Sequence, residues 1–149
     1  MDFTRRQWII GTGSAIALLG SACSMFRTRS EIDQVADELD DRLRQLSGPD
    51  MNERLAIAED IRRQATALLE SHDTFANEFN RRAVDRDVSA EELYQRVSDY
   101  EIERKALRKK LLQSQDRLHA VVPEGEWPQI LDLLNRKGET VASARGTVG

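Results

Sequence analysis

The segment VSAEEL, residues 88–93, divides a stretch without proline or glycine, residues 50–122, into two long predicted helices. Ser89 and Glu92 have the spacing of a capping box, in which each side chain binds the other residue's exposed backbone amide at a helix start. The absence of helix-breaking residues on either side allows both helices to continue without interruption. A turn near Arg86 therefore predicts two long helices that run in opposite directions.

The same kind of signal marks the other helix boundaries. SGPDMNE, residues 47–53, interrupts the chain with a Gly-Pro pair, and Asp50 and Glu53 then repeat the capping-box spacing. WPQILDLLNRKG, residues 127–138, predicts a short last helix, because proline is acceptable in a first helical turn and Gly138 is typical of a helix end. These boundaries divide the chain into four helices.

Apolar residues recur every three or four positions in these segments, as on one face of an α-helix. The first stripe consists of Ile32, Val35, Leu39, Leu43 and Leu46. The second consists of Met51, Leu55, Ala58, Ile61, Ala65, Leu68, His72, Phe75 and Phe79. The third consists of Leu93, Val97, Tyr100, Leu107, Leu111, Leu118 and Val121, with Arg104 and Ser114 as polar interruptions. The prediction is an all-α antiparallel helical hairpin or bundle of about four helices, two of them long.

The N-terminal stretch has the layout of an export signal. No charged residue occurs from Trp8 to Ala22. This uncharged run is shorter than the roughly 20 apolar residues of a membrane-spanning helix. TRRQWII, residues 4–10, resembles the twin-arginine export motif, with Arg5 and Arg6 as its pair and Trp8 where the motif usually has Phe. The alternative is an ordinary export signal that contains two adjacent arginines by chance.

LLGSAC, residues 18–23, resembles the lipobox of bacterial lipoproteins, although Gly20 occupies the position usually held by Leu. Cys23 is the only cysteine, so it cannot form an internal disulfide, and it stands where the resemblance implies lipidation. A retained signal anchor with a free cysteine is the alternative.

The expected organisation follows from these signals. It is a signal peptide over 1–22, a lipidated cysteine and tether over 23–30 with a helix cap at Ser30, a helical bundle domain over 31–139, and a disordered tail over 140–149. We expect a membrane-anchored protein that faces the periplasm. Because Ser24 follows the cysteine in place of the Asp typical of inner-membrane retention, the outer membrane is the expected site.

The charge balance argues against nucleic acid as a partner. The chain has 22 basic and 26 acidic residues and a formal net charge of −4. Removal of residues 1–22, which hold two arginines and one aspartate, would make the net charge more negative. Nucleic-acid binding calls for a clustered excess of positive charge.

The sequence offers little for catalysis. It has neither a Gly-x-Ser-x-Gly nucleophile elbow nor a glycine-rich phosphate loop. The hairpin register places His72 opposite Tyr100 and His119 opposite Glu53, so the two histidines would lie about 28 Å apart along the helix axis. They could share a metal ion only across an antiparallel dimer. We predict no metal and no cofactor, with His72 as a partly buried helix residue and His119 as a weaker metal or proton-sensing candidate.

Two charged segments have opposite signs. EIDQVADELDD, residues 31–41, contains six acids, and ERKALRKK, residues 103–110, contains the cations Arg104, Lys105, Arg108, Lys109 and Lys110. Both can be solvated helix faces, with the acidic helix packed beside the cations and small gains from exposed ion pairs. The cations can instead form a docking surface for an acidic partner or an anionic lipid.

The segment LHAVVPEGEWPQIL, residues 118–131, gives the helical part a resemblance to the small periplasmic proteins of the Spy chaperone and heavy-metal-sensor group. The resemblance covers about residues 51–137. VPEGEW, residues 122–127, stands in place of the group's usual turn, and the Leu-Thr-x-x-Gln repeats and metal-binding His and Met clusters are missing. The resemblance implies a dimeric, curved hairpin that binds unfolded chains or a membrane sensor.

The sequence therefore predicts a lipid-anchored, periplasm-facing helical protein with a structural or protein-binding role and no catalysis. Its partners would be the membrane, through a lipid on Cys23, and an unidentified protein, with homodimerisation as a further option. A Spy-like stress chaperone or an accessory of a metal or stress sensor is the first alternative. A cofactor-dependent enzyme exported by the twin-arginine route is the second.

Overall fold

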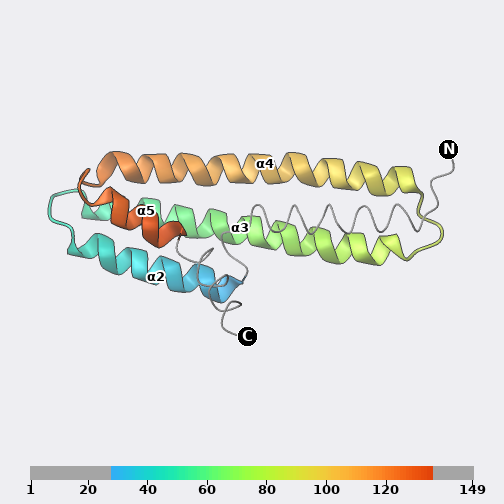
Figure 1. Ribbon diagram of the computed structural model, residues 1–149, viewed down its shortest axis with the longest axis horizontal. Helices are drawn as coiled ribbons and strands as arrows, with labels where there is room; N and C mark the ends of the chain where they lie inside the picture. Colours follow the sequence, from blue (N-terminus) through green and yellow to red (C-terminus); the bar gives the residue numbers. More distant parts are fainter. Residues whose placement is uncertain (1–27, 136–149) are drawn as a thin grey trace, which may run out of the picture. The chain divides into compact units, whose positions relative to one another are not determined.

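The structure is a computed structural model that describes residues 28–135. It contains four helices, α2 (Arg29–Gln45), α3 (Met51–Ala83), α4 (Ala90–Val121) and α5 (Trp127–Asn135), as Figure 1 shows. Helices α3 and α4 have 33 and 32 residues, and no strand occurs within the described range. The predicted all-α class with two long helices is confirmed.

The start of α4 has the predicted capping box. The backbone N–H of Ser89 donates to Glu92 Oε2 at 2.7 Å, and the backbone N–H of Glu92 donates to Ser89 Oγ at 3.1 Å. The two residues thereby satisfy backbone donors that the helix itself leaves unpaired. This part of the fold follows from four consecutive residues.

Helix α2 begins earlier than predicted. Its N-cap is Thr28, whose hydroxyl accepts a hydrogen bond from the backbone N–H of Glu31 at 3.2 Å, while Ser30 lies within the first turn. Thr28 and Glu31 also have capping-box spacing, and this pair forms the helix start. The helical domain therefore begins at Arg29, before the predicted boundary at residue 31.

The described chain forms two compact units, to which α3 and α4 both contribute. One, the hairpin unit, consists of Glu70–Lys105, and the other, the four-helix unit, consists of residues 28–69 and 106–135. Each unit has its own cluster of buried apolar side chains. Separate clusters of this kind are what a division into compact units requires.

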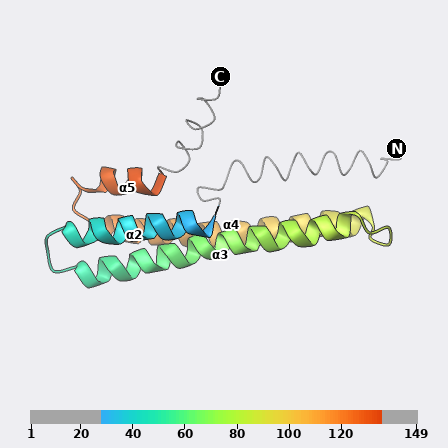
Figure 2. The same ribbon diagram turned by 90° about the horizontal axis from the view of Figure 1, so that it is seen from below.

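In the four-helix unit, α2 lies beside the first part of α3, and α5 lies along α2 and the last part of α4, on the side away from α3 (Figures 1 and 2). All five residues of the predicted first stripe are buried, and α5 adds Ile130, Leu133 and Leu134 to the same cluster. The apolar face of each helix is thus covered by the others, which supplies most of the stability of short helices in proteins.

The buried face of α3 in this unit is broader than predicted. Ile57 and Arg54 are buried although they lie outside the predicted stripe, whereas Leu55 and Leu68 are only partly buried. Because α3 is covered by α2 as well as by α4, its buried arc extends beyond the single stripe that a two-helix hairpin needs. Ser114, predicted as a polar interruption, is also buried, and its hydroxyl donates to Gln64 Oε1 at 3.1 Å.

The hairpin unit is an antiparallel pair of helical segments with an aromatic core. Phe75, Phe79, Leu93 and Tyr100 are its buried residues. The rings of Phe75 and Tyr100 stack with centroids 4.0 Å apart and an interplanar angle of 7°. Close ring stacking across the two helices fixes their register at this point.

Candidate functional site

The predicted export and lipidation residues, Arg5, Arg6 and Cys23, lie outside the described residues. The residues from the sequence analysis that the structure does place are the five cations of α4 and the two histidines. They lie in different places, so each is described by itself.

The basic segment of α4 is a surface feature with no single orientation. Lys105, Arg108, Lys109 and Lys110 are exposed and Arg104 is half-buried. At about 100° of rotation per residue, these positions point to several sides of the helix. Arg104 and Lys105 belong to the hairpin unit, and the other three belong to the four-helix unit. In the latter, Lys109 and Lys110 are adjacent exposed cations.

His72 has the partner predicted for it. Its Nδ1 lies 3.0 Å from the hydroxyl oxygen of Tyr100, at hydrogen-bonding distance, and both side chains belong to the hairpin unit. The hydrogen bond satisfies two polar atoms next to the Phe75 and Tyr100 stack. His72 is therefore a structural residue of the hairpin core.

His119 lies beside Trp127, whereas the sequence predicted Glu53. The two rings stack with centroids 4.3 Å apart and an interplanar angle of 13°. In the four-helix unit, Arg54 donates a hydrogen bond to the carbonyl of Val121, and Gln64 accepts one from Ser114. Because the two helices are antiparallel, Glu53, which precedes Arg54, lies opposite a residue that follows Val121. The register near the turn therefore does not continue to this end of the helices. Trp127, at the start of α5, lies against the His119 ring instead.

Neither histidine is part of a metal site in the described chain. No group of three or more His, Cys, Asp or Glu side chains within residues 28–135 is arranged to hold a metal ion. Within the same range, no helix combines the length and the apolar character that crossing a membrane requires.

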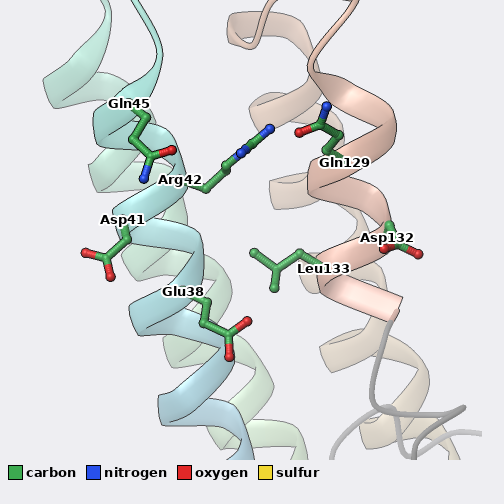
Figure 3. A pocket seen from close by; sticks show the side chains of 7 residues that line it. All are labelled: Glu38, Asp41, Arg42, Gln45, Gln129, Asp132 and Leu133. Carbon is green, nitrogen blue, oxygen red and sulfur yellow. The ribbon is translucent and has the colours of Figure 1, made fainter.

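A surface groove of about 390 Å³ lies between α2 and α5 in the four-helix unit. Its lining residues are Glu38, Asp41, Arg42, Gln45, Gln129, Asp132 and Leu133. Figure 3 shows Leu133 pointing from α5 toward α2 and Arg42 reaching from α2 toward Gln129, while Asp41 and Asp132 stand at the outer edges. The groove therefore has an apolar side chain, Leu133, at its centre and a carboxylate at each edge.

Arg42 does not neutralise the groove's acids. Its Nη2 lies 3.3 Å from Glu126 Oε2, in the turn before α5, so its charge is paired with a carboxylate that does not line the groove. Three lining residues, Glu38, Asp41 and Asp132, are acidic, and the groove is negative in balance. The acidic segment 31–41, which supplies Glu38 and Asp41, is the feature of the sequence that points to this groove.

Asp40, on the same helix, carries a carboxyl with a perturbed pKa. Burial raises its pKa above the ordinary value of 3.8, and the neighbouring Glu59 and Asp37 carboxylates raise it further, although Arg44 opposes them. Burial first, and the nearby carboxylates second, thus disfavour the ionised form of this carboxyl.

The polar centre of the four-helix unit is Arg54, which the sequence analysis did not single out. Its side chain is 3% exposed and donates to two backbone carbonyls, those of Val121 and Ser47. A buried arginine that donates hydrogen bonds to carbonyl oxygens at or just beyond helix ends has a structural function. A lone arginine between alanine-rich and acidic neighbours gives no sequence signal of this role.

Comparison of the chain with known protein families, with curated proteins and with solved structures finds no match.

Proposed function

We propose that the chain is a lipid-anchored helical protein that faces the periplasm and binds other proteins without catalysing a reaction. The observation that carries the proposal is the start of the folded domain at Thr28, with only residues 24–27 between this helix cap and Cys23. A lipid on Cys23 would hold such a domain directly at a membrane surface. Two or more acyl chains bind a membrane firmly, whereas one chain binds it only marginally.

The binding role is supported by the surfaces of the four-helix unit. The groove between α2 and α5 carries carboxylates at its edges, and Lys109 and Lys110 are exposed on α4. Oppositely charged surfaces of this kind favour protein association by steering and by specificity more than by raw affinity. Neither a metal site nor a cofactor is part of the proposal.

The anchor is tested by the intact mass and the location of the full chain expressed in a bacterium. We expect a protein that begins at Cys23, carries acyl mass and stays in the membrane fraction through high-salt washing. Cys23→Ser should carry no lipid, and it should either release a helical domain or accumulate as uncut precursor. A wild-type protein that starts at another residue, or that lacks lipid mass, contradicts the proposal.

A further inference from the structure

We propose that the groove between α2 and α5 binds the Lys109 and Lys110 region of α4 from a second copy of this chain. The inference rests on the proposed protein-binding role and names its partner. All of the residues involved belong to the four-helix unit.

The first support is charge. Asp41 and Asp132 are exposed and stand on opposite edges of the groove, one on each helix (Figure 3). Lys109 and Lys110 are exposed neighbours on α4. Two ammonium groups on flexible stems can reach two carboxylates on either side of a groove, and surface exposure keeps the desolvation cost of each pair small.

The second support is the position of the exposed leucines. Within the described residues of the four-helix unit, the large apolar side chains recorded as exposed are Leu112, at 45%, and Leu131, at 40%. Leu112 follows Lys109 by three positions, so both lie on one face of α4. Leu131 precedes Leu133 by two positions and so points to another side of α5, whereas Leu133 lines the groove itself. The α4 segment therefore carries an exposed leucine, and the groove has a leucine in its lining. An apolar centre with a charged rim is the usual anatomy of a protein interface.

The third support is that one chain carries both surfaces. Two copies can make the same contact reciprocally, with the groove of each against the α4 segment of the other, as a two-fold dimer requires. Pairing of two grooves would oppose carboxylates, and pairing of two α4 segments would oppose ammonium groups. Like charges in contact are unfavourable, so the groove-to-segment arrangement is the one that the charges select.

The experiment uses two variants of the full chain, each carrying a different affinity tag and extracted in mild detergent. The groove variant has Asp41→Lys and Asp132→Lys, and the segment variant has Lys109→Glu and Lys110→Glu. Differently tagged wild-type copies should co-purify, and salt should weaken their association. Each variant should lose association with itself by tenfold or more, because its two surfaces then have the same sign. The two variants should nevertheless bind each other, because their mixture restores both oppositely charged contacts.

Matched controls place the same charge changes in the hairpin unit. The control for the groove variant has Asp73→Lys and Glu103→Lys, and the control for the segment variant has Arg81→Glu and Arg86→Glu. These controls should co-purify as wild type does, and circular dichroism should show all variants to be helical. Absence of wild-type association would overturn the inference, as would failure of the two folded variants to bind each other or equal losses in the controls. The inference would also be overturned if the segment variant lost binding to anionic vesicles but still self-associated, since Lys109 and Lys110 would then bind lipid and not a second copy. Lipid mass at Cys23, measured on the same samples, reports separately on the anchor.

Discussion

Arg54 donates its Nε–H to the backbone carbonyl of Val121 at 2.8 Å, from a side chain that is only 3% exposed. Its Nη1 also donates to the carbonyl of Ser47 at 3.2 Å. Val121 is the last residue of α4, and Ser47 lies just after α2, so one guanidinium serves carbonyls at the ends of two helices. The carbonyl end of a helix carries partial negative charge, which stabilises the cation.

Arg54→Met is the first test of this arrangement. Methionine keeps much of the side-chain volume but leaves two carbonyl oxygens without their donor, and each such loss typically costs about 1–3 kcal/mol. We expect the free energy of unfolding to fall by about 2–4 kcal/mol, measured by urea denaturation. Arg63→Met is the control, because Arg63 is 71% exposed and pairs with Asp60 on the surface. A control loss as large as that of Arg54→Met would contradict the structural role of the buried guanidinium.

The parts of the fold that the sequence could predict are those that depend on neighbours in the chain. The Ser89 and Glu92 capping box needs four residues, and the buried stripe of α2 needs only helical periodicity, so both could be recognised from local pattern. The His72 and Tyr100 contact was also predictable, because it lies close to the turn that sets the register.

The groove and the role of Arg54 depend on packing between distant segments. Arg54 is buried because α2 and the end of α4 meet at its side chain, and the groove exists because α5 folds back along α2. No local sequence pattern predicts where α5 will lie. The same fold-back explains why His119 stacks on Trp127, whereas the hairpin register alone pointed to Glu53.

The capping box at α4 gives a prediction for pH. The Ser89 backbone N–H, followed by the Ser89 hydroxyl, holds the pKa of Glu92 below its ordinary value of 4.5. Because the folded-state pKa is the lower one, the stabilisation is complete above the unfolded-state pKa and is lost as pH falls through the folded-state pKa. Glu92→Gln should therefore lower Tm at pH 7, and the difference from wild type should shrink as pH falls below 4.5.

Two variants separate the cap from a general charge effect at the start of α4. Glu91→Gln removes the same charge in the same first turn and should lower Tm less, because helix-dipole attraction alone is weaker than a charge-assisted hydrogen bond. Ser89→Ala should cost about 1 kcal/mol at pH 7, as expected for loss of an N-cap hydroxyl. Equal effects of the two glutamate substitutions at all pH values would show that the capping contact contributes nothing.

Asp40 gives the opposite prediction for pH, because ionisation of its carboxyl lowers the stability of the fold. Burial, with Glu59 and Asp37 nearby, raises its pKa above 3.8, so ionisation is less favourable in the folded than in the unfolded chain. That cost is fully present above the folded-state pKa and disappears as pH falls toward 3.8. Asp40→Asn should raise Tm at pH 7, with a gain that vanishes in acid. Asp41→Asn, at an exposed neighbouring position, should change Tm less, and a decrease in Tm for Asp40→Asn would show that its charge stabilises the fold.

The export route is tested through Arg5 and Arg6, which precede the uncharged stretch from Trp8 to Ala22. The twin-arginine receptor reads the arginine pair itself, whereas the general export route needs only positive charge before the apolar run. Replacement of both arginines by lysine keeps the charge and removes the pair. We expect uncut precursor to accumulate in the cytoplasm, measured by fractionation and intact mass after pulse labelling. A single Arg6→Lys change is the matched intermediate and should slow export less than the double change. If the double lysine variant is exported and processed at the wild-type rate, the chain uses the general route and its two arginines contribute charge alone.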